Sequence, residues 1–203
     1  MDLLNPKRLG ALRGLARPVV FAWVLAAMTL SAYTISPPGA AAQSGGPTEY
    51  EVKAAFLFNF AKFVEWPLAA ISPANQVRLI LCIVGDDPFG PDLSRVVAGQ
   101  SVRGQAIQIR RYRFGDDLRP CHVLFISASE RPHLTQILAG LQGAHALTVS
   151  DIDGFAEAGG VMQFVTEESR VRFVVNLEAA SRAKLRVNSK LLALARVMNH
   201  AEP

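Results

Sequence analysis

Two short motifs place paired aspartates directly after apolar segments, where such pairs can act in phosphate chemistry. One is LTVSDIDGF at residues 147–155, an apolar run that ends in Asp-x-Asp-Gly. In aspartate-dependent phosphatases the first aspartate attacks phosphorus and the second acts as acid and base. No later acidic pair follows an apolar strand to hold magnesium, and the glutamate of a calcium loop is not in place. We therefore predict that Asp151 and Asp153 cap a brief helix at 152–157, with Gly154 easing the turn.

The second motif is GDDPFG at residues 85–90, which follows another apolar run. Doubly wound sheets bind ligands at the carboxyl ends of their strands, so this position is informative. The motif is neither GxGxxG nor a Walker A loop, and two carboxylates would repel a phosphate. We predict that Asp87 caps a helix at 88–98 and that Pro88 is its first residue. The alternative is contact with a ligand that is not an anion.

The remaining reactive side chains form no recognisable catalytic set. The histidines have no ligand spacing with Cys, Asp or Glu; they are His122, His133, His145 and His200. No Gly-x-Ser-x-Gly elbow accompanies Ser127 or Ser129, and Cys82 lies in the middle of an apolar run. The sequence predicts no catalytic residue, no metal site and no cofactor.

The elements that would position these residues alternate between helices and apolar strands. We expect strands at 77–84, 105–113, 122–127, 146–150, 161–166 and 171–176. We expect helices at 48–65, 88–98, 132–141, 152–157, 177–184 and 189–199. Arginines at 110, 111 and 113 predict that their strand lies near a sheet edge or is at least half solvated. This order predicts a compact Rossmann-like three-layer α/β domain, with a mostly parallel mixed sheet, a C-terminal β-hairpin and closing helices.

In such a sheet the carboxyl ends of parallel strands meet at one edge. Asp86, Ser127 and Asp151 each follow an expected strand closely. A small-molecule pocket at that edge would be lined by these three residues, which are our candidate ligand contacts.

The first expected helix has one aromatic residue out of place. Thr48 and Glu51 form a capping box at its start. At 100° per residue most apolar side chains share one face, but Phe58 lies in the polar stripe that contains Lys62. We predict that Phe58 and Lys62 contact a partner protein. The alternative is burial of Phe58 under the segment 67–75.

The chain begins with an expected export signal. Residues 1–42 combine basic residues, an uncharged apolar stretch at 19–33 and the small-residue pattern that ends at Ala42. We predict a signal peptide cleaved after Ala42, a leader at 43–47 and a domain at 48–203. The alternative is an uncleaved anchor in the inner membrane.

Removing the signal peptide changes the charge balance. The 203-residue chain has 21 basic and 17 acidic residues, of which the signal holds four and one. The exported part therefore has 17 basic and 16 acidic residues, a net charge of +1. This balance gives no electrostatic case for binding nucleic acid.

Both cysteines, Cys82 and Cys121, remain in the exported part. An even number of cysteines in an oxidising compartment favours a disulfide between them. The alternative is two buried free thiols in adjacent strands.

Four segments occur in a characteristic order along the exported chain. They are EYEVKAAFLFNFAKFVEWP (49–67), LCIVGDDPFG (81–90), LTVSDIDGFAEAGGVMQFV (147–165) and VRFVVNLEAASRAKLRVNSKLLALARVM (171–198). As a set they resemble the YfiR-like family of periplasmic regulatory proteins.

The resemblance implies an exported, Rossmann-like, often dimeric protein without catalytic activity. It implies repression of an inner-membrane diguanylate cyclase through the cyclase's periplasmic sensor region, which lowers cyclic di-GMP and biofilm formation. It also implies modulation by redox state and by an outer-membrane peptidoglycan-binding protein, with a disulfide at Cys82 and Cys121. The additional cysteine pair of the best understood member has no counterpart here. The alternative function is a small-molecule-binding sensor subunit for a membrane histidine kinase.

Overall fold

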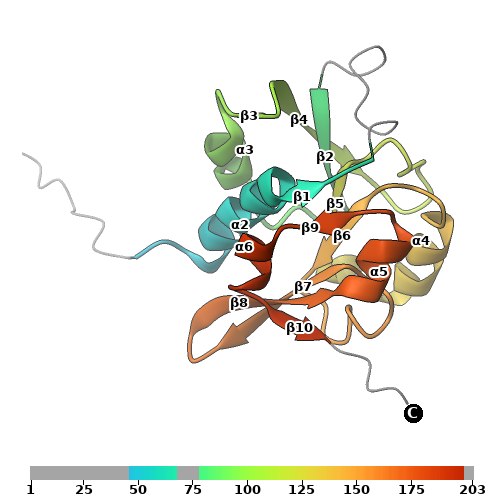
Figure 1. Ribbon diagram of the computed structural model, residues 1–203. Coiled ribbons are helices and arrows are strands. Elements are labelled where there is room, and N and C mark those ends of the chain that lie inside the picture. Colours follow the sequence, from blue (N-terminus) through green and yellow to red (C-terminus); the bar gives the residue numbers. More distant parts are fainter. Residues whose placement is uncertain (1–45, 68–77, 199–203) are drawn as a thin grey trace, which may run out of the picture. The chain divides into compact units, whose positions relative to one another are not determined.

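A sheet with helices on both faces is the framework of the protein (Figure 1). The computed structural model describes residues 46–67 and 78–198. The strands are β1 (Val64–Glu65), β2 (Arg78–Val84), β3 (Ser101–Val102), β4 (Gln105–Tyr112), β5 (Val123–Ile126), β6 (Leu147–Ser150), β7 (Met162–Glu167), β8 (Arg170–Asn176), β9 (Arg186–Val187) and β10 (Arg196–Met198). The helices are α2 (Glu49–Phe63), α3 (Pro91–Val97), the 3-10 helix η2 (Ala128–His133), α4 (Leu134–Gly140), α5 (Leu177–Arg182) and α6 (Ser189–Leu192).

Eight of these strands form one mixed sheet in the order β10-β8-β7-β6-β5-β2-β4-β3. Within the described residues, five of its seven neighbouring pairs are parallel. The antiparallel pairs are β3 with β4 and the hairpin of β7 and β8. The predicted α/β class, with a mostly parallel mixed sheet and a C-terminal hairpin, is therefore confirmed.

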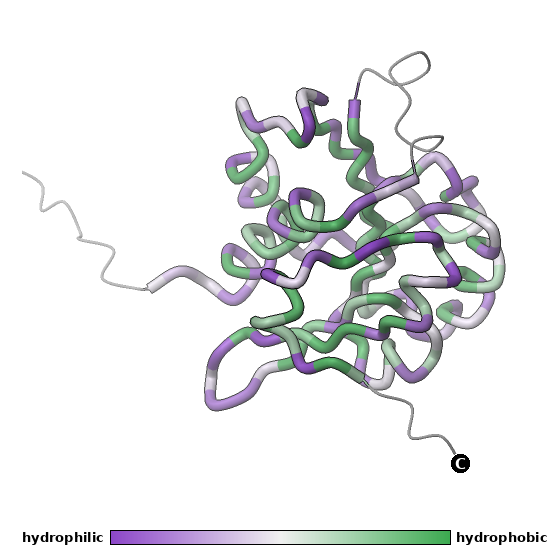
Figure 2. Tube along the Cα trace, in the orientation of Figure 1, coloured by the Kyte–Doolittle hydropathy of each residue, from purple (hydrophilic) through white to green (hydrophobic). Residues whose placement is uncertain are grey.

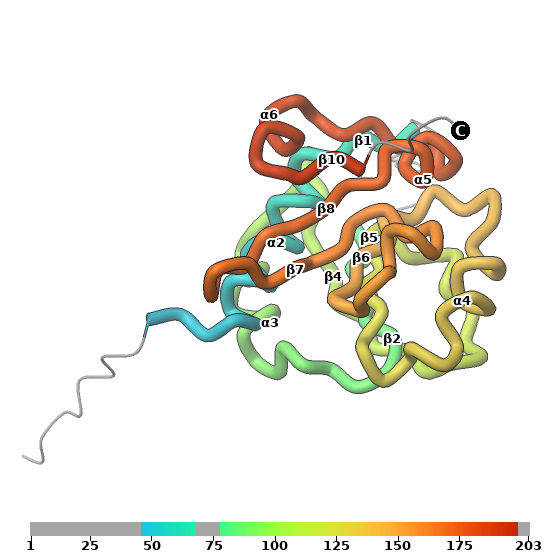
Figure 3. The backbone as a smooth tube through the Cα atoms, turned by 90° about the horizontal axis from the view of Figure 1, so that it is seen from below, coloured from blue at the N-terminus to red at the C-terminus, as the bar shows by residue number. Residues whose placement is uncertain are grey.

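Two apolar clusters lie on opposite faces of the sheet, because successive side chains of a strand alternate between its faces. On β2, Leu81 and Ile83 belong to the cluster under α2, α3, α5 and α6. Cys82 and Val84 belong to the cluster under α4. Figure 2 shows that the central strands are largely apolar, and Figure 3 shows them between α2 and α3 on one side and α4 on the other.

The first helix begins as predicted and ends early. Thr48 Oγ1 accepts from the Glu51 amide at 3.2 Å, and the Glu51 carboxylate accepts from the Thr48 amide at 2.6 Å, which completes the capping box. The helix ends at Phe63 because the next two residues are extended and pair with β9. No helix in the described residues is long and apolar enough to cross a membrane.

The expected helix at 152–157 is wrong. Residues 152–159 form consecutive turns, closed by bonds such as Phe155 N–H to Ile152 C=O at 3.1 Å. Gly154 and Gly159 have φ of +77° and +101°, a left-handed conformation that interrupts a helix. The segment forms turns and not a helix, because glycine adopts positive φ angles without the steric cost that a Cβ atom would add.

Two other helix boundaries also differ from the prediction. The expected helix at 189–199 is limited to α6, because Arg196–Met198 pairs in parallel with β8 and completes the sheet as β10. Tertiary pairing has overridden helix propensity there. Helix α3 begins at Pro91 with Gly90 as its N-cap residue, so Asp87 does not cap it.

Candidate functional site

Three adjacent parallel strands have their carboxyl ends side by side, at the end of the sheet where a doubly wound fold binds its ligands. Val84 of β2, Ile126 of β5 and Ser150 of β6 are in register. The next residues along the chain are Gly85, Ser127 and Asp151. The fold thus brings Ser127 and Asp151 to neighbouring strand ends, with Asp86 one residue further on.

Ser127 and Asp86 are engaged in local structure at this edge. Ser127 is buried, and its hydroxyl accepts from the Ser129 amide at 3.5 Å as the N-cap of η2. The backbone amide of Asp86 donates to Ser129 Oγ at 3.0 Å, and Asp86 itself is exposed. These contacts connect the β2 loop to the start of η2.

Asp87 links the same loop to a neighbouring strand. Its Oδ1 accepts from the Phe89 amide at 2.8 Å, and its Oδ2 pairs with Arg111 of β4 at 2.7 Å. The GDDPFG motif is therefore a turn fixed by its own aspartate. The Phe89 ring that it presents is buried and lies edge-on to Phe125, with centroids 4.7 Å apart.

Asp151 takes part in a buried ion pair with the first helix. Its Oδ2 accepts from Lys53 Nζ at 2.7 Å and from the Tyr50 hydroxyl at 3.0 Å. Lys53 also pairs with Glu49 at 2.6 Å, one helical turn earlier. The side chains of Lys53 and Asp151 are 4% and 10% exposed. The amino-terminal half of α2 thus lies over the end of β6, where Lys53 supplies the positive charge that pairs with Asp151.

The surroundings of this pair are partly aromatic. Lys53 Nζ lies 4.4 Å from the centroid of Tyr50, whose ring is edge-on to Phe89 at 5.5 Å. Asp151 Oδ1 is buried and has no hydrogen-bond partner in the part of the chain that the structure describes. The ion pair is thus shielded from water. The negative charge of the Asp151 carboxylate is stabilised through Oδ2 alone, by Lys53 and Tyr50.

The titration of these groups follows from the pairing. Burial of the Lys53 ammonium works against its charged form, but the hydrogen bonds to Asp151 and Glu49 outweigh burial, and the pKa of Lys53 is raised. Burial, followed by the neighbouring Asp151 carboxylate, also raises the pKa of Tyr50. Lys53 therefore stays protonated at neutral pH, which makes its amine a poor nucleophile.

The two aspartates of the Asp-x-Asp-Gly motif do not converge. The Asp153 side chain is 96% exposed and lies 3.7 Å from Arg131, whereas Asp151 is buried beneath α2. Within residues 46–67 and 78–198, no group of His, Cys, Asp or Glu could hold a metal ion. The arrangement provides an electrostatic attachment for α2 and does not combine a nucleophile with an acid.

Lys53 and Tyr50 are not among the site residues predicted from the sequence, although the sequence contains a signal for Lys53. Lys53 falls in the middle of the apolar face of the helix, between Val52 and Leu57, where a lysine is unexpected. A lysine at such a position requires a buried anion, and Asp151 supplies it.

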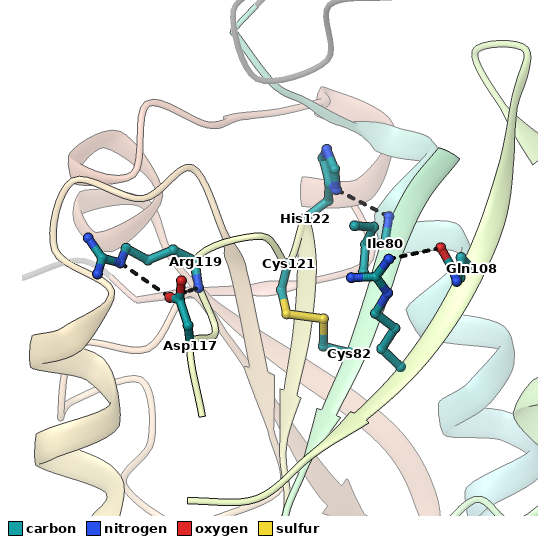
Figure 4. Close-up of a disulfide and its surroundings, with 8 residues drawn as sticks. Ile80, Cys82, Gln108, Asp117, Arg119, Cys121 and His122 are labelled. Atoms are coloured by element: carbon teal, nitrogen blue, oxygen red, sulfur yellow. Dashed lines mark hydrogen bonds and ion pairs between the residues drawn. A yellow bond between two sulfur atoms is a disulfide. The ribbon is translucent and has the colours of Figure 1, made fainter. Parts of the chain in front are cut away.

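The two cysteines form a disulfide, as favoured from the sequence (Figure 4). Cys82 lies in the middle of β2, and Cys121 lies just before β5, with 5.8 Å between their Cα atoms. Both residues are buried. The bond therefore attaches the long β4–β5 connection to β2, the strand that lies between β4 and β5.

The predicted partner-contact residues lie on α2. Phe58 is half-buried and packs against the apolar cluster beneath the helix, so it is less exposed than its position in the polar stripe suggested. Lys62 is exposed, with its ammonium 5.9 Å from the Phe63 ring centroid. The segment invoked to cover Phe58 lies mostly outside the described residues.

Three pockets of about 430, 450 and 380 Å³ lie on the described residues, away from the strand ends. One lies between residues 114–119 and α4, the second between α4 and α5, and the third between α2 and the β7–β8 hairpin. None of these three is lined by Asp86, Ser127 or Asp151.

Comparisons with known proteins cover most of the chain. The sequence model of a family described as YfiR/HmsC-like matches residues 50–196. Among solved structures, the chain is similar to a conserved domain protein from Vibrio cholerae O1 biovar El Tor strain N16961, at 10% identity and a TM-score of 0.48. The match covers 75% of this chain and 60% of that one.

A second solved structure is an ABC domain in complex with L-Trp from Streptococcus pneumonia, at 10% identity and a TM-score of 0.49. That match covers 71% of this chain and 60% of the other. The chain thus spans about 60% of the length of both solved structures.

Proposed function

Because the chain belongs to the YfiR/HmsC-like family, we propose that it is an exported regulatory protein that acts on a membrane signalling protein. The observation that carries the proposal is the family match, which extends from α2 to the start of β10. The proposed activity is protein binding rather than catalysis, and it includes no nucleic acid.

The finer proposal is that the partner is the periplasmic sensor region of an inner-membrane diguanylate cyclase. Binding would hold the cyclase inactive and keep cyclic di-GMP low. Repression of this kind requires only that the protein bind one state of the cyclase better than the other. A coupling free energy of about 1–3 kcal/mol changes the affinity roughly 5- to 150-fold.

Periplasmic location is supported by the disulfide, because such bonds persist in oxidising compartments. The proposed signal peptide at residues 1–42, with cleavage after Ala42, lies outside the described residues. An outer-membrane peptidoglycan-binding protein and a homodimer also remain proposals, which rest on the family resemblance.

We propose that the partner protein contacts the exposed side of α2 around Phe58 and Lys62. Lys62 is free to reach a partner, and the half-buried Phe58 would add apolar area at its side. Replacing Lys62 with Glu reverses a charge on an exposed helix position without opening the core, which makes it the cleaner probe of the two.

The alternative function, a small-molecule-binding sensor subunit for a histidine kinase, has less support at the predicted residues. Lys53 occupies one oxygen of Asp151, and Ser127 caps η2. A ligand at that edge would have to displace α2 from the ion pair. The pockets elsewhere leave the alternative open to a thermal-shift screen with amino acids and nucleotides.

The proposed function is tested by deleting the gene in its own host and measuring cellular cyclic di-GMP. We expect a rise on deletion and a return to the starting level when the gene is restored. The purified protein should also bind the isolated periplasmic region of the cyclase. Unchanged cyclic di-GMP together with no binding would refute the cyclase as the partner.

A further inference from the structure

Strand β4 leaves most of one edge without a neighbour. Among the described residues, β3 pairs only with Gln105 and Ala106, and the remaining residues of β4, 107–112, pair on one side alone, with β2 (Figure 1). The burial of the two strands agrees with this topology. Six of the seven residues of β2 are buried, whereas no residue of β4 is fully buried.

The open stretch is long and regular enough to accept another strand. Its six residues match the usual length of a β-strand. The pairing with β2 continues in register to Tyr112 without a bulge, and the stretch contains no proline. Bulges and prolines are two of the devices with which proteins blunt an exposed edge, and β4 lacks both; the protection it does carry is charge, from Arg110 and Arg111.

The charged side chains of β4 itself are all arginines, and two carboxylates lie next to them, those of Asp87 and of Asp116, whose Oδ2 accepts from the Arg113 backbone amide at 2.7 Å. Arg110 and Arg111 lie on β4 and Arg113 follows it, and all three are exposed. Arg111 pairs with Asp87 at 2.7 Å. In the described parts of the chain, neither Arg110 nor Arg113 has a carboxylate within ion-pair distance, and Arg110 contacts only the Gln108 amide oxygen, at 3.4 Å.

The two arginines without a carboxylate partner flank the edge from opposite faces. Gln108, Arg110 and Tyr112 alternate with Ile107, Ile109 and Arg111 along the strand. Tyr112 packs against the cluster under α4, whereas Ile107 and Ile109 pack against the cluster under α2. Arg110 therefore stands on the α4 face, and the alternation puts Arg113 on the α2 face.

The positive charge of the exposed arginines favours one kind of strand at this edge. A second copy of the chain, joined β4 to β4, would add further arginines and no carboxylate from the strand itself, and like charges that fall directly opposite on paired strands are destabilising. An extended segment with acidic side chains would place carboxylates within cross-strand distance of Arg110 or Arg113.

We propose that residues 107–112 of β4 form a docking site for an extended acidic segment of a partner protein, which adds to the sheet as a further strand. Main-chain hydrogen bonds supply the attachment, and Arg110 and Arg113 supply the preference for carboxylates. Only the identity of the protein that donates the segment rests on the proposed function.

The docking site is tested by NMR with the purified, 15N-labelled protein and two defined peptides. One eight-residue peptide alternates Thr with Glu, its counterpart alternates Thr with Lys, and both have blocked termini. We expect the acidic peptide to shift the amides of residues 107–112, to protect the alternate amides of this stretch that do not already pair with β2, and to bind at least tenfold more tightly than its counterpart. Because the arginines are exposed, binding should weaken as salt increases.

Variants separate the edge from net charge. The double variant Arg110→Glu with Arg113→Glu should weaken acidic-peptide binding at least tenfold. A control with the same change in net charge, Arg170→Glu with Arg172→Glu, reverses two exposed charges on β8, which is paired with β7, and should change binding less than twofold. Equal affinity for both peptides, shifts confined to other elements, or an equal loss in the control would overturn the proposal.

Measuring amide protection in a complex with the periplasmic region of the cyclase distinguishes the strand-addition site from the proposed function. A complex that slows hydrogen exchange at 107–112 supports both. A complex without that protection leaves the proposed function standing and overturns the strand-addition site. If the acidic peptide protects 107–112 while the cyclase region does not bind and deletion leaves cyclic di-GMP unchanged, the edge site stands and the cyclase is refuted as the partner.

Discussion

Removal of the Lys53 ammonium should be among the most destabilising single changes in the domain. In Lys53→Met the apolar stem keeps about the same volume, so packing changes little. Asp151, however, keeps only the Tyr50 hydroxyl, because its Oδ1 has no other partner in the described residues. Breaking a buried pair by removing one partner costs about 3–5 kcal/mol, since it leaves an uncompensated charge.

The measurements are urea denaturation for the free energy of unfolding and thermal denaturation for the melting temperature, both followed by far-UV circular dichroism with the disulfide intact. At about 2–4 °C per kcal/mol for a domain of this size, the melting temperature should fall by about 6–20 °C. Lys62→Met is the matched control, because it makes the same change on the same helix at an exposed position. It should alter stability by less than about 0.5 kcal/mol.

A double variant tests the cause of the loss. Lys53→Met with Asp151→Asn removes both charges, so it should be more stable than the sum of the two single losses predicts. A loss below about 1 kcal/mol in Lys53→Met, or additive single losses, would refute a buried ion pair as the reason that α2 stays docked.

The effect of pH on this pair follows from the raised pKa of Lys53. Its contribution is fully present below the ordinary value of 10.5 and is lost as the pH rises through the higher folded-state value. The difference in stability between wild type and Lys53→Met should therefore be constant between about pH 6 and 9 and should narrow only in stronger alkali.

Three further perturbations test other parts of the structure. Replacing both Cys82 and Cys121 with Ala should lower the free energy of unfolding by about 4 kcal/mol in the chain-entropy model for residues 39 apart, measured in urea without reductant; equal midpoints would argue against the bond. Gly160→Ala would put a Cβ within 2.1 Å of the buried Phe155 ring and should cost at least about 1–3 kcal/mol in the same assay, whereas Gly140→Ala, which meets open space, should be nearly neutral. Lys62→Glu should weaken capture of the cyclase region at least tenfold in a binding assay without changing the melting temperature, and full retention of binding would exclude this part of α2 from the interface.

Features coded by neighbouring residues were predictable from the sequence. The Thr48 and Glu51 capping box, the doubly buried β2 and the β7–β8 hairpin all depend on residues a few positions apart. The arginines of β4 also indicated its edge position correctly, because a charged strand cannot be buried on both sides.

Features that depend on distant partners were not predictable in the same way. Strands β1, β9 and β10 have two or three residues each, and only their neighbours in the fold make them strands. The Lys53–Asp151 pair joins residues 98 positions apart, and nothing close to Asp151 indicates which cation it receives. The lysine on the apolar face showed that a buried anion was needed but did not show which one.

The position of α2 also sets the order in which the chain can fold. Its buried ring Phe60 packs against Phe164 and Phe173, which are synthesised more than 100 residues later. Sequence-distant contacts slow folding, because a long loop must close before they form. The packing of Phe60 is therefore completed only after the last hairpin has been synthesised, and until then this ring can contribute to aggregation.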